Sequence, residues 1–110
     1  MGVIKPQVLL CILAVLLISS CTSHKNGDPK THVVEIKQMS FVPKKLTVSS
    51  GDTVKWVNLD LVTHNVNFQD RKSPKLEQGE QFAIVVSDNA EYRCSLHPVM
   101  EGQILIKNHK

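Results

Sequence analysis

The chain has 110 residues, of which 42 % are hydrophobic, and its formal net charge at pH 7 is +3. A chain of this length buries one small core, which excludes a multidomain enzyme. No apolar run after Ile18 approaches the roughly 20 residues of a spanning helix, which excludes a polytopic membrane protein. The basic residues form no long run, so the sequence gives no sign of a nucleic-acid-binding surface. Three cysteines are too few for a disulfide scaffold.

Residues 1–20 have the pattern of an export signal. Lys5 supplies a positive charge, and residues 8–18 form an unbroken apolar stretch of 11 residues, which is the length of a signal-peptide core. The string LISSC, which ends at Cys21, resembles a bacterial lipobox, in which the cysteine is lipidated and becomes the mature N-terminus. The alternative is an ordinary secretory signal that is cleaved nearby and leaves Cys21 free. We therefore predict an exported, membrane-anchored lipoprotein that faces the periplasm or the cell surface.

Residues 21–31 are expected to be the lipidated cysteine and a flexible tether, because residues 22–31 contain no large apolar side chain. Ten such residues reach roughly 15–20 Å. The folded domain is then residues 32–110, and we expect it to be monomeric. Cys94 is its one cysteine, so it forms no internal disulfide and is either an inert buried thiol or a reactive or metal-binding one.

Apolar and polar residues alternate with a period of two along most of the domain, which predicts short strands. The expected strands are residues 33–38, 46–48, 53–58, 64–68, 80–86, 91–94 and 103–107. Residues 70–75 are compatible with one short helical turn. The predicted fold is an all-β sandwich of about seven to eight strands. The aromatic residues expected in its core are Phe41, Trp56, Phe68 and Phe82, and the histidines expected to be solvated are His24, His32 and His109.

Three side chains that can bind a metal follow one another in an expected loop. Cys94, His97 and Met100 have the spacing Cys-x2-His-x2-Met, and a thiolate, an imidazole and a thioether suit a soft ion such as copper. His64 opens an earlier strand, and a sandwich can bring the start of that strand to the same end as the loop. Two imidazoles and a thiolate with a weak axial Met100 form a blue-copper arrangement. Zinc accepts the first three ligands as well, but the methionine argues against it.

The domain resembles the cupredoxin family, and within it the plastocyanin and amicyanin branch, from about Val33 to Lys107. The strings that carry the resemblance are Phe41-Val42-Pro43, Leu46-Thr47-Val48, GDTVKWVN from Gly51, His64-Asn65-Val66, and YRCSLHPVMEG from Tyr92. The family implies a Greek-key sandwich and one type 1 copper ion, with ligands that fall here on His64, Cys94, His97 and Met100.

The chain departs from the family pattern in three ways that remove no ligand. Residues 65–93, which separate His64 from Cys94, number only 29, fewer than in typical plastocyanins. Arg93 replaces the aromatic or histidine residue often found before the cysteine, and Leu96 replaces the proline of amicyanin-like loops. Leu96 therefore keeps a backbone N–H, which we expect to point at the Cys94 sulfur and to raise the reduction potential.

The function expected from these features is electron transfer by a membrane-tethered type 1 copper protein. The alternative is a copper-binding lipoprotein that sequesters or delivers the ion, and we expect no enzymatic activity because no orienting acid or oxyanion donor is suggested near Cys94. Asn65 is expected to hydrogen-bond to Ser95 and so to tie the two ligand segments together. Redox proteins are expected to dock near His97, on an apolar patch formed by Leu96, Pro98 and Val99.

Overall fold

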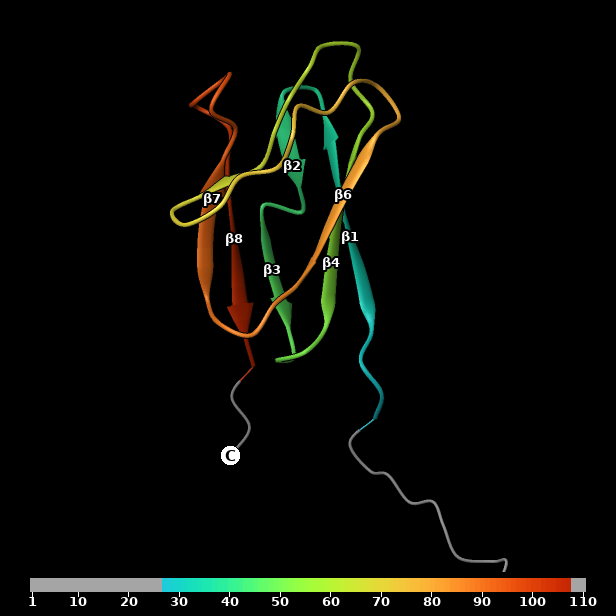
Figure 1. Ribbon diagram of the computed structural model, residues 1–110, viewed down its shortest axis with the longest axis vertical. Coiled ribbons are helices and arrows are strands. Elements are labelled where there is room, and N and C mark those ends of the chain that lie inside the picture. The colour runs from blue at the N-terminus through green and yellow to red at the C-terminus, as the bar shows by residue number, and fades with distance from the viewer. Residues whose placement is uncertain (1–26, 108–110) are drawn as a thin grey trace, which may run out of the picture.

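Eight strands form in the part of the chain that the structure, a computed structural model, describes: residues 27–107 (Figure 1). No helix occurs among these residues. The strands are β1 (Thr31–Lys37), β2 (Ser40–Val42), β3 (Lys45–Val48), β4 (Thr53–Asn58), β5 (Asn67–Phe68), β6 (Gln81–Val85), β7 (Ala90–Arg93) and β8 (Glu101–Ile106).

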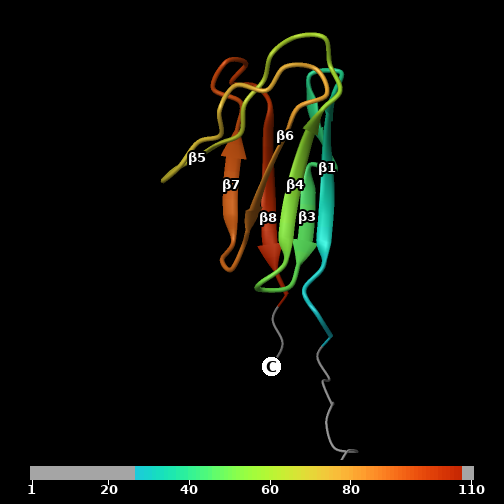
Figure 2. The same cartoon turned by 45° about the vertical axis from the view of Figure 1, so that its right-hand side comes forward.

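The strands form two four-stranded sheets that face each other (Figure 2). The first sheet has the order β2-β1-β4-β6 and the second has the order β3-β8-β7-β5. The pairs β1–β4 and β3–β8 are parallel, and the remaining pairs are antiparallel. The prediction of an all-β sandwich with about seven to eight strands is confirmed.

The core lies between the two sheets and is rich in aromatic rings. Trp56 on β4 is fully buried, and its ring makes edge-on contacts with the rings of Phe68 and Tyr92. Gly102 lies opposite Tyr92 in the β7–β8 pair, and a Cβ atom at that position would overlap the tyrosine ring. A larger residue at position 102 would therefore force the buried Tyr92 ring, two residues before Cys94, to move. Of the other expected core aromatics, Phe41 is buried and Phe82 packs against the cluster.

The two ends of the sandwich carry different parts of the chain. At one end, which we call the site end, the loop 94–100 joins β7 to β8 beside the long segment that follows β4 (Figure 1). The turn at Gln38 and Met39 lies there too, because β1 runs parallel to β4 and ends beside it. At the opposite end, β1 begins next to the start of β4, and β8 ends next to the end of β3. The chain therefore enters the domain at the end remote from loop 94–100.

Two expectations about the segment between β4 and β6 are wrong. The strand expected at residues 64–68 is shortened to β5, with His64 in an isolated bridge to Leu76, and no helical turn forms at residues 70–75. This segment instead folds back as an irregular hairpin, in which Phe68 N–H donates to the Arg71 carbonyl and Ser73 N–H donates to the Val66 carbonyl. These local hydrogen bonds use backbone N–H and carbonyl groups that a helical turn or a longer strand pairing would otherwise need.

The predicted signal peptide, Cys21 and most of the predicted tether lie outside the described residues, as do His24 and His109. Within residues 27–107, no helix has the length and apolar character needed to cross a bilayer.

Candidate metal centre

Three nitrogen and sulfur donors from two separate segments converge at the site end. The Cys94 Sγ atom lies 3.7 Å from Nδ1 of His64 and 3.7 Å from Nδ1 of His97. All three atoms lie within 4.8 Å of one another, and this is the group of potential metal-binding side chains found among residues 27–107. The two imidazole rings meet edge to face, with centroids 4.9 Å apart. A thiol and two ring nitrogens therefore face one common point.

Backbone hydrogen bonds give the loop after β7 a fixed shape. Cys94 N–H donates to the Met100 carbonyl at 3.1 Å, and Met100 N–H donates to the His97 carbonyl at 2.9 Å. His97 N–H donates to the Cys94 carbonyl at 3.3 Å. These bonds close the loop on itself just before β8 begins. Cys94 and Met100 are buried at its base, and His97 is half-buried near its tip.

His64 is held from its backbone and from its ring. Its N–H and carbonyl exchange hydrogen bonds with Leu76, at 3.2 and 2.7 Å, and its side chain is fully buried. The ring Nε2 lies 2.8 Å from an oxygen of Asp60. A carboxylate only accepts hydrogen bonds, so Nε2 carries the proton, and in the neutral ring Nδ1 is then a free lone pair facing Cys94.

Asp60 is a residue that the sequence analysis did not single out. Its carboxylate accepts the N–H of Gln38 at 2.7 Å and that of Met39 at 3.0 Å, besides the ring of His64. Burial acts to raise the pKa of Asp60, but the hydrogen bonds from Met39, His64 and Gln38 together outweigh it and hold the pKa below its ordinary value of 3.8. The only sequence signal was a carboxylate four positions before His64.

Asn65 and Ser95 connect the two ligand-bearing segments directly. Ser95 N–H donates to Asn65 Oδ1 at 2.8 Å, and Asn65 Nδ2 donates to Ser95 Oγ at 2.8 Å. Because each residue neighbours a metal-capable side chain, the pair fixes the spacing between His64 and Cys94. The hydrogen bond proposed from Leu96 N–H to the Cys94 sulfur stays a prediction.

Exposed apolar side chains lie at the site end, next to His97 in the loop and in the segment that follows β4. Val99 is 84 % exposed and Leu96 is 40 % exposed, and Pro98 between them is exposed as well. Leu61, from the segment that follows β4, is 82 % exposed. Apolar side chains left in water at one end of a small domain are typical of a contact surface.

The donor set fits a type 1 copper ion better than other common ions. One thiolate and two neutral imidazoles form the trigonal set of blue-copper sites, and a methionine supplies their weak axial ligand. Here the sulfur is fully buried between the two rings, and Met100 is buried in the same loop. A magnesium or calcium site needs oxygen ligands instead, and the three converging atoms include none.

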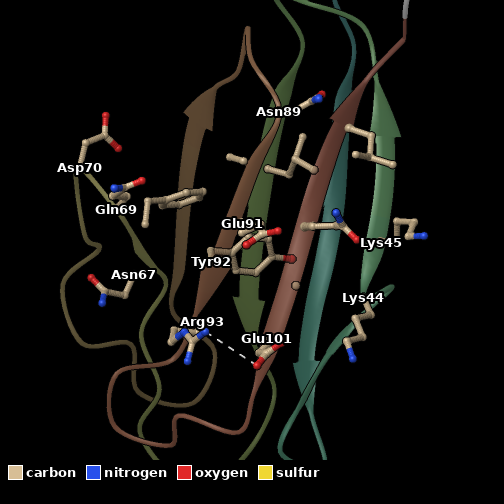
Figure 3. Close-up of a pocket in the computed structure, with 16 residues that line it drawn as sticks. Lys44, Lys45, Asn67, Gln69, Asp70, Asn89, Glu91, Tyr92, Arg93 and Glu101 are labelled. Carbon is tan, nitrogen blue, oxygen red and sulfur yellow. Dashed lines mark ion pairs between the residues drawn. The ribbon is translucent and has the colours of Figure 1, made fainter.

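The broad concave surface of the second sheet is a separate feature (Figure 3). Its lining is largely polar and charged, with Lys45 on β3, Glu91 on β7 and an ion pair of 3.8 Å between Arg93 and Glu101. None of the three converging donors lines it. It is therefore not part of the candidate metal centre.

A second histidine–aspartate pair lies at the opposite end, and it corrects an expectation. His32 is not freely solvated, because its Nε2 lies 2.8 Å from an oxygen of Asp52 and its side chain is only 25 % exposed. Asp52 also accepts the N–H groups of Lys30 and Ser49. The hydrogen bonds from Lys30, His32 and Ser49 lower the pKa of Asp52 to about 2.

Comparison with known proteins places the chain in a family. The family model of the cupredoxin-like domain matches residues 9–106. Among curated relatives, the amicyanin of Paracoccus denitrificans is 29 % identical over 68 % of this chain and 64 % of its own length, and the plastocyanin of Nostoc punctiforme is 34 % identical over 59 % of this chain and 51 % of its own. The chain thus spans between about half and just under two thirds of the length of these relatives.

Solved structures agree with this placement. A Cu(I) structure of an amicyanin variant superimposes with a TM-score of 0.67 at 27 % identity, covering 70 % of this chain and 82 % of the other. A purple cupredoxin from Nitrosopumilus maritimus gives a TM-score of 0.64 at 26 % identity, covering 69 % of this chain and 99 % of the other. The chain belongs to the cupredoxin-like family.

Proposed function

We propose that this protein carries single electrons on one type 1 copper ion held by His64, Cys94, His97 and Met100. The observation that carries the proposal is the convergence of a buried sulfur and two Nδ1 atoms from segments 30 positions apart. The amicyanin, plastocyanin and purple cupredoxin relatives support the same reading. Copper in such a site exchanges one electron between Cu(I) and Cu(II) while keeping its ligands.

The residues around the donors favour fast electron exchange, because they hold the donor atoms in fixed positions. The hydrogen bonds between Asn65 and Ser95 hold the two segments at a fixed separation, and the closed loop holds Cys94 relative to Met100. A donor set locked by its supporting residues needs little rearrangement when its charge changes. Metal binding also favours the deprotonated sulfur of Cys94.

His97 connects the converging donors to the protein surface. Its ring faces Cys94 through Nδ1 while the residue stays partly exposed, and the exposed Leu96, Pro98 and Val99 surround it. We propose that redox proteins dock on this apolar patch. Small apolar contact areas suit brief encounters, which an electron carrier needs in order to release its partner.

We also propose that a lipid on Cys21 tethers the domain to a membrane after export. β1 begins at the opposite end of the sandwich from loop 94–100, and Cys21 precedes β1 by ten residues of sequence. A tether joined there leaves the site end directed away from the membrane surface. The apolar patch around His97 then stays accessible to partners.

The test is spectroscopy and voltammetry of the full-length protein loaded with Cu(II). We expect an intense sulfur-to-copper band in the visible spectrum and a fast, reversible one-electron couple. In Cys94→Ser the band should vanish. Tight Cu(I) binding with a colourless or green Cu(II) form and sluggish electrochemistry would contradict the proposal and favour copper sequestration or delivery.

The anchor is tested separately by growing the producing cells with a labelled fatty acid. Label and membrane association should be present in the unaltered chain and absent from Cys21→Ala. A soluble, unlabelled chain with an intact Cys21 would contradict the anchor and leave the copper site unaffected.

A further inference from the structure

We propose that Asp60 is a positioning residue for the copper site: it fixes the ring of His64 and lowers the reduction potential of the bound ion. This inference rests on the proposed function. Metal-binding histidines commonly donate their second ring N–H to an oxygen acceptor, which orients the ring and makes it a stronger donor. A carboxylate is the strongest acceptor available for that role, since its hydrogen bonds are charge-assisted.

The geometry assigns a different role to each ring nitrogen of His64: one donates a hydrogen bond to Asp60, and the other faces Cys94. Asp60 Oδ2 lies 2.8 Å from His64 Nε2, and the other ring nitrogen, Nδ1, lies 3.7 Å from Cys94 Sγ. The carboxylate has no hydrogen to give, so the Nε2 proton belongs to the bond with Asp60. His64 is fully buried, so no water competes for that proton.

Asp60 is itself held from three sides, which distinguishes it from a mobile surface acid. Gln38 N–H binds Oδ1, Met39 N–H binds Oδ2, and the backbone N–H of Asp60 donates to Asn58 Oδ1 at 2.9 Å. Gln38 and Met39 have φ angles of 53° and 60°, an uncommon conformation for residues other than glycine. The β1–β2 turn thus adopts a strained backbone that directs two N–H groups at this carboxylate.

The direction of the effect on the potential follows from charge. A negative carboxylate near the site and a more basic imidazole both stabilise Cu(II) more than Cu(I), because Cu(II) carries the higher charge. Stabilising the oxidised ion lowers the reduction potential. Removing the carboxylate charge must therefore raise it.

Asp60→Asn is the sharpest variant, because it keeps the shape and removes the charge. Its side chain offers one oxygen where three N–H groups need acceptors, so its NH2 group faces at least one backbone or ring donor. The matched control is Asp52→Asn. It alters an equally short histidine–carboxylate pair, also 2.8 Å, at the opposite end of the sandwich.

The experiment measures reduction potentials and Cu(II) affinities of the full-length protein and both variants. We expect Asp60→Asn to keep the sulfur-to-copper band, to bind Cu(II) about 10- to 100-fold more weakly, and to have a higher potential. Each tenfold loss of Cu(II) affinity relative to Cu(I) corresponds to about 59 mV for one electron. Asp52→Asn should match the unaltered protein in both quantities. An unchanged or lower potential in folded Asp60→Asn would overturn the proposal.

A second measurement covers the case in which Asp60→Asn does not fold. Nitrogen-15 NMR of the metal-free, unaltered protein should show His64 protonated at Nε2 and unprotonated at Nδ1, and the reverse tautomer would overturn the positioning role. Absence of the sulfur-to-copper band from the unaltered, copper-loaded protein would overturn the proposed function instead. The tautomer measurement would still decide what Asp60 does to His64.

Discussion

The two histidine–aspartate pairs, one at each end of the sandwich, have the same separation but different surroundings. His64 and Asp60 lie 2.8 Å apart with the histidine fully buried, and His32 and Asp52 lie 2.8 Å apart with the histidine 25 % exposed. The first pair faces a sulfur and a second imidazole. The second pair instead joins the start of β1 to the turn before β4.

A histidine–carboxylate pair does not by itself make a candidate metal site, because only one of the two pairs has further donors beside it. What differs is the partner of the second ring nitrogen: at the site end, His64 Nδ1 faces Cys94 at the base of loop 94–100. At the opposite end the carboxylate mainly satisfies the backbone N–H groups of Lys30 and Ser49. The same chemical pair holds a candidate metal ligand in one place and joins two strands in the other.

The largest difference in Cu(II) affinity between changes at the two ends should come from replacing His64 or His32 with alanine. His64→Ala removes one of the three converging donors, so we expect Cu(II) affinity to fall by more than the 100-fold that marks loss of a supporting residue. His32→Ala should leave the affinity and the visible spectrum unchanged. Competition titration with a copper chelator measures both, and equal losses in the two variants would remove the distinction.

The next contrast replaces one asparagine at each end. Asn65 makes two hydrogen bonds of 2.8 Å to Ser95 at the site end, and exposed Asn89 accepts one from Ile106 N–H at the opposite end. Asn65→Ala should cost about 1–3 kcal/mol of unfolding free energy and broaden the copper spectrum, whereas Asn89→Ala should cost about 0.5–1.5 kcal/mol and leave the spectrum intact. Urea unfolding and electron paramagnetic resonance report the two effects. A larger loss of unfolding free energy in Asn89→Ala than in Asn65→Ala, or a changed copper spectrum in Asn89→Ala, would contradict the expected difference between the two ends.

The opposite end should lose stability in acid, because the pKa of Asp52 is lowered from 3.8 to about 2 by hydrogen bonds from Lys30, His32 and Ser49. A carboxyl group with a depressed pKa in the folded state adds stability above its unfolded pKa. That stability is lost as the pH falls from about 4 towards 2. Asp52→Asn should therefore be less stable than the unaltered protein at pH 6, and the gap should narrow at pH 2. Urea unfolding at the two values checks this, and a constant gap would show that the charge is not involved.

The smallest expected effect is that of Leu96→Pro. If Leu96 N–H donates to the Cys94 sulfur, proline removes that bond, and the reduction potential should fall by a few tens of mV, less than the ~59 mV of a tenfold change. Val99→Pro is the control, because it changes the same exposed loop two residues before β8 begins. A potential equal to that of the unaltered protein in Leu96→Pro would refute the predicted bond.

The alternation of side chains predicted the strands that are buried on one face. The strand expected at residues 53–58 is observed as β4 with the same bounds, because Val54 and Trp56 alternate with residues nearer the surface. The strand expected at residues 64–68 shrinks to β5, because the chain folds back locally and the backbone of His64 pairs with Leu76 instead of with a long strand. Periodicity carries no information about such partners.

The candidate ligands could be recognised from their spacing and from the strings shared with the family. The residues that hold these ligands in place could be recognised only in part. Asn65 and Ser95 each stand next to a ligand candidate, so their contact was expected from the sequence. Asp60 was missed, because its role depends on the turn at Gln38 and Met39, more than 20 positions earlier. The pairing of His32 with Asp52 was missed for the same reason, since it requires the parallel register of β1 and β4.

We propose above that His64, Cys94 and His97 bind one copper ion together. X-ray absorption at the copper edge of the full-length, Cu(II)-loaded protein tests it most directly, because the first coordination shell identifies its donor atoms. We expect one short copper–sulfur distance and two imidazole nitrogens, with the sulfur contribution absent from Cys94→Ala. A shell of nitrogen and oxygen alone, or a spectrum unchanged by Cys94→Ala, would contradict it.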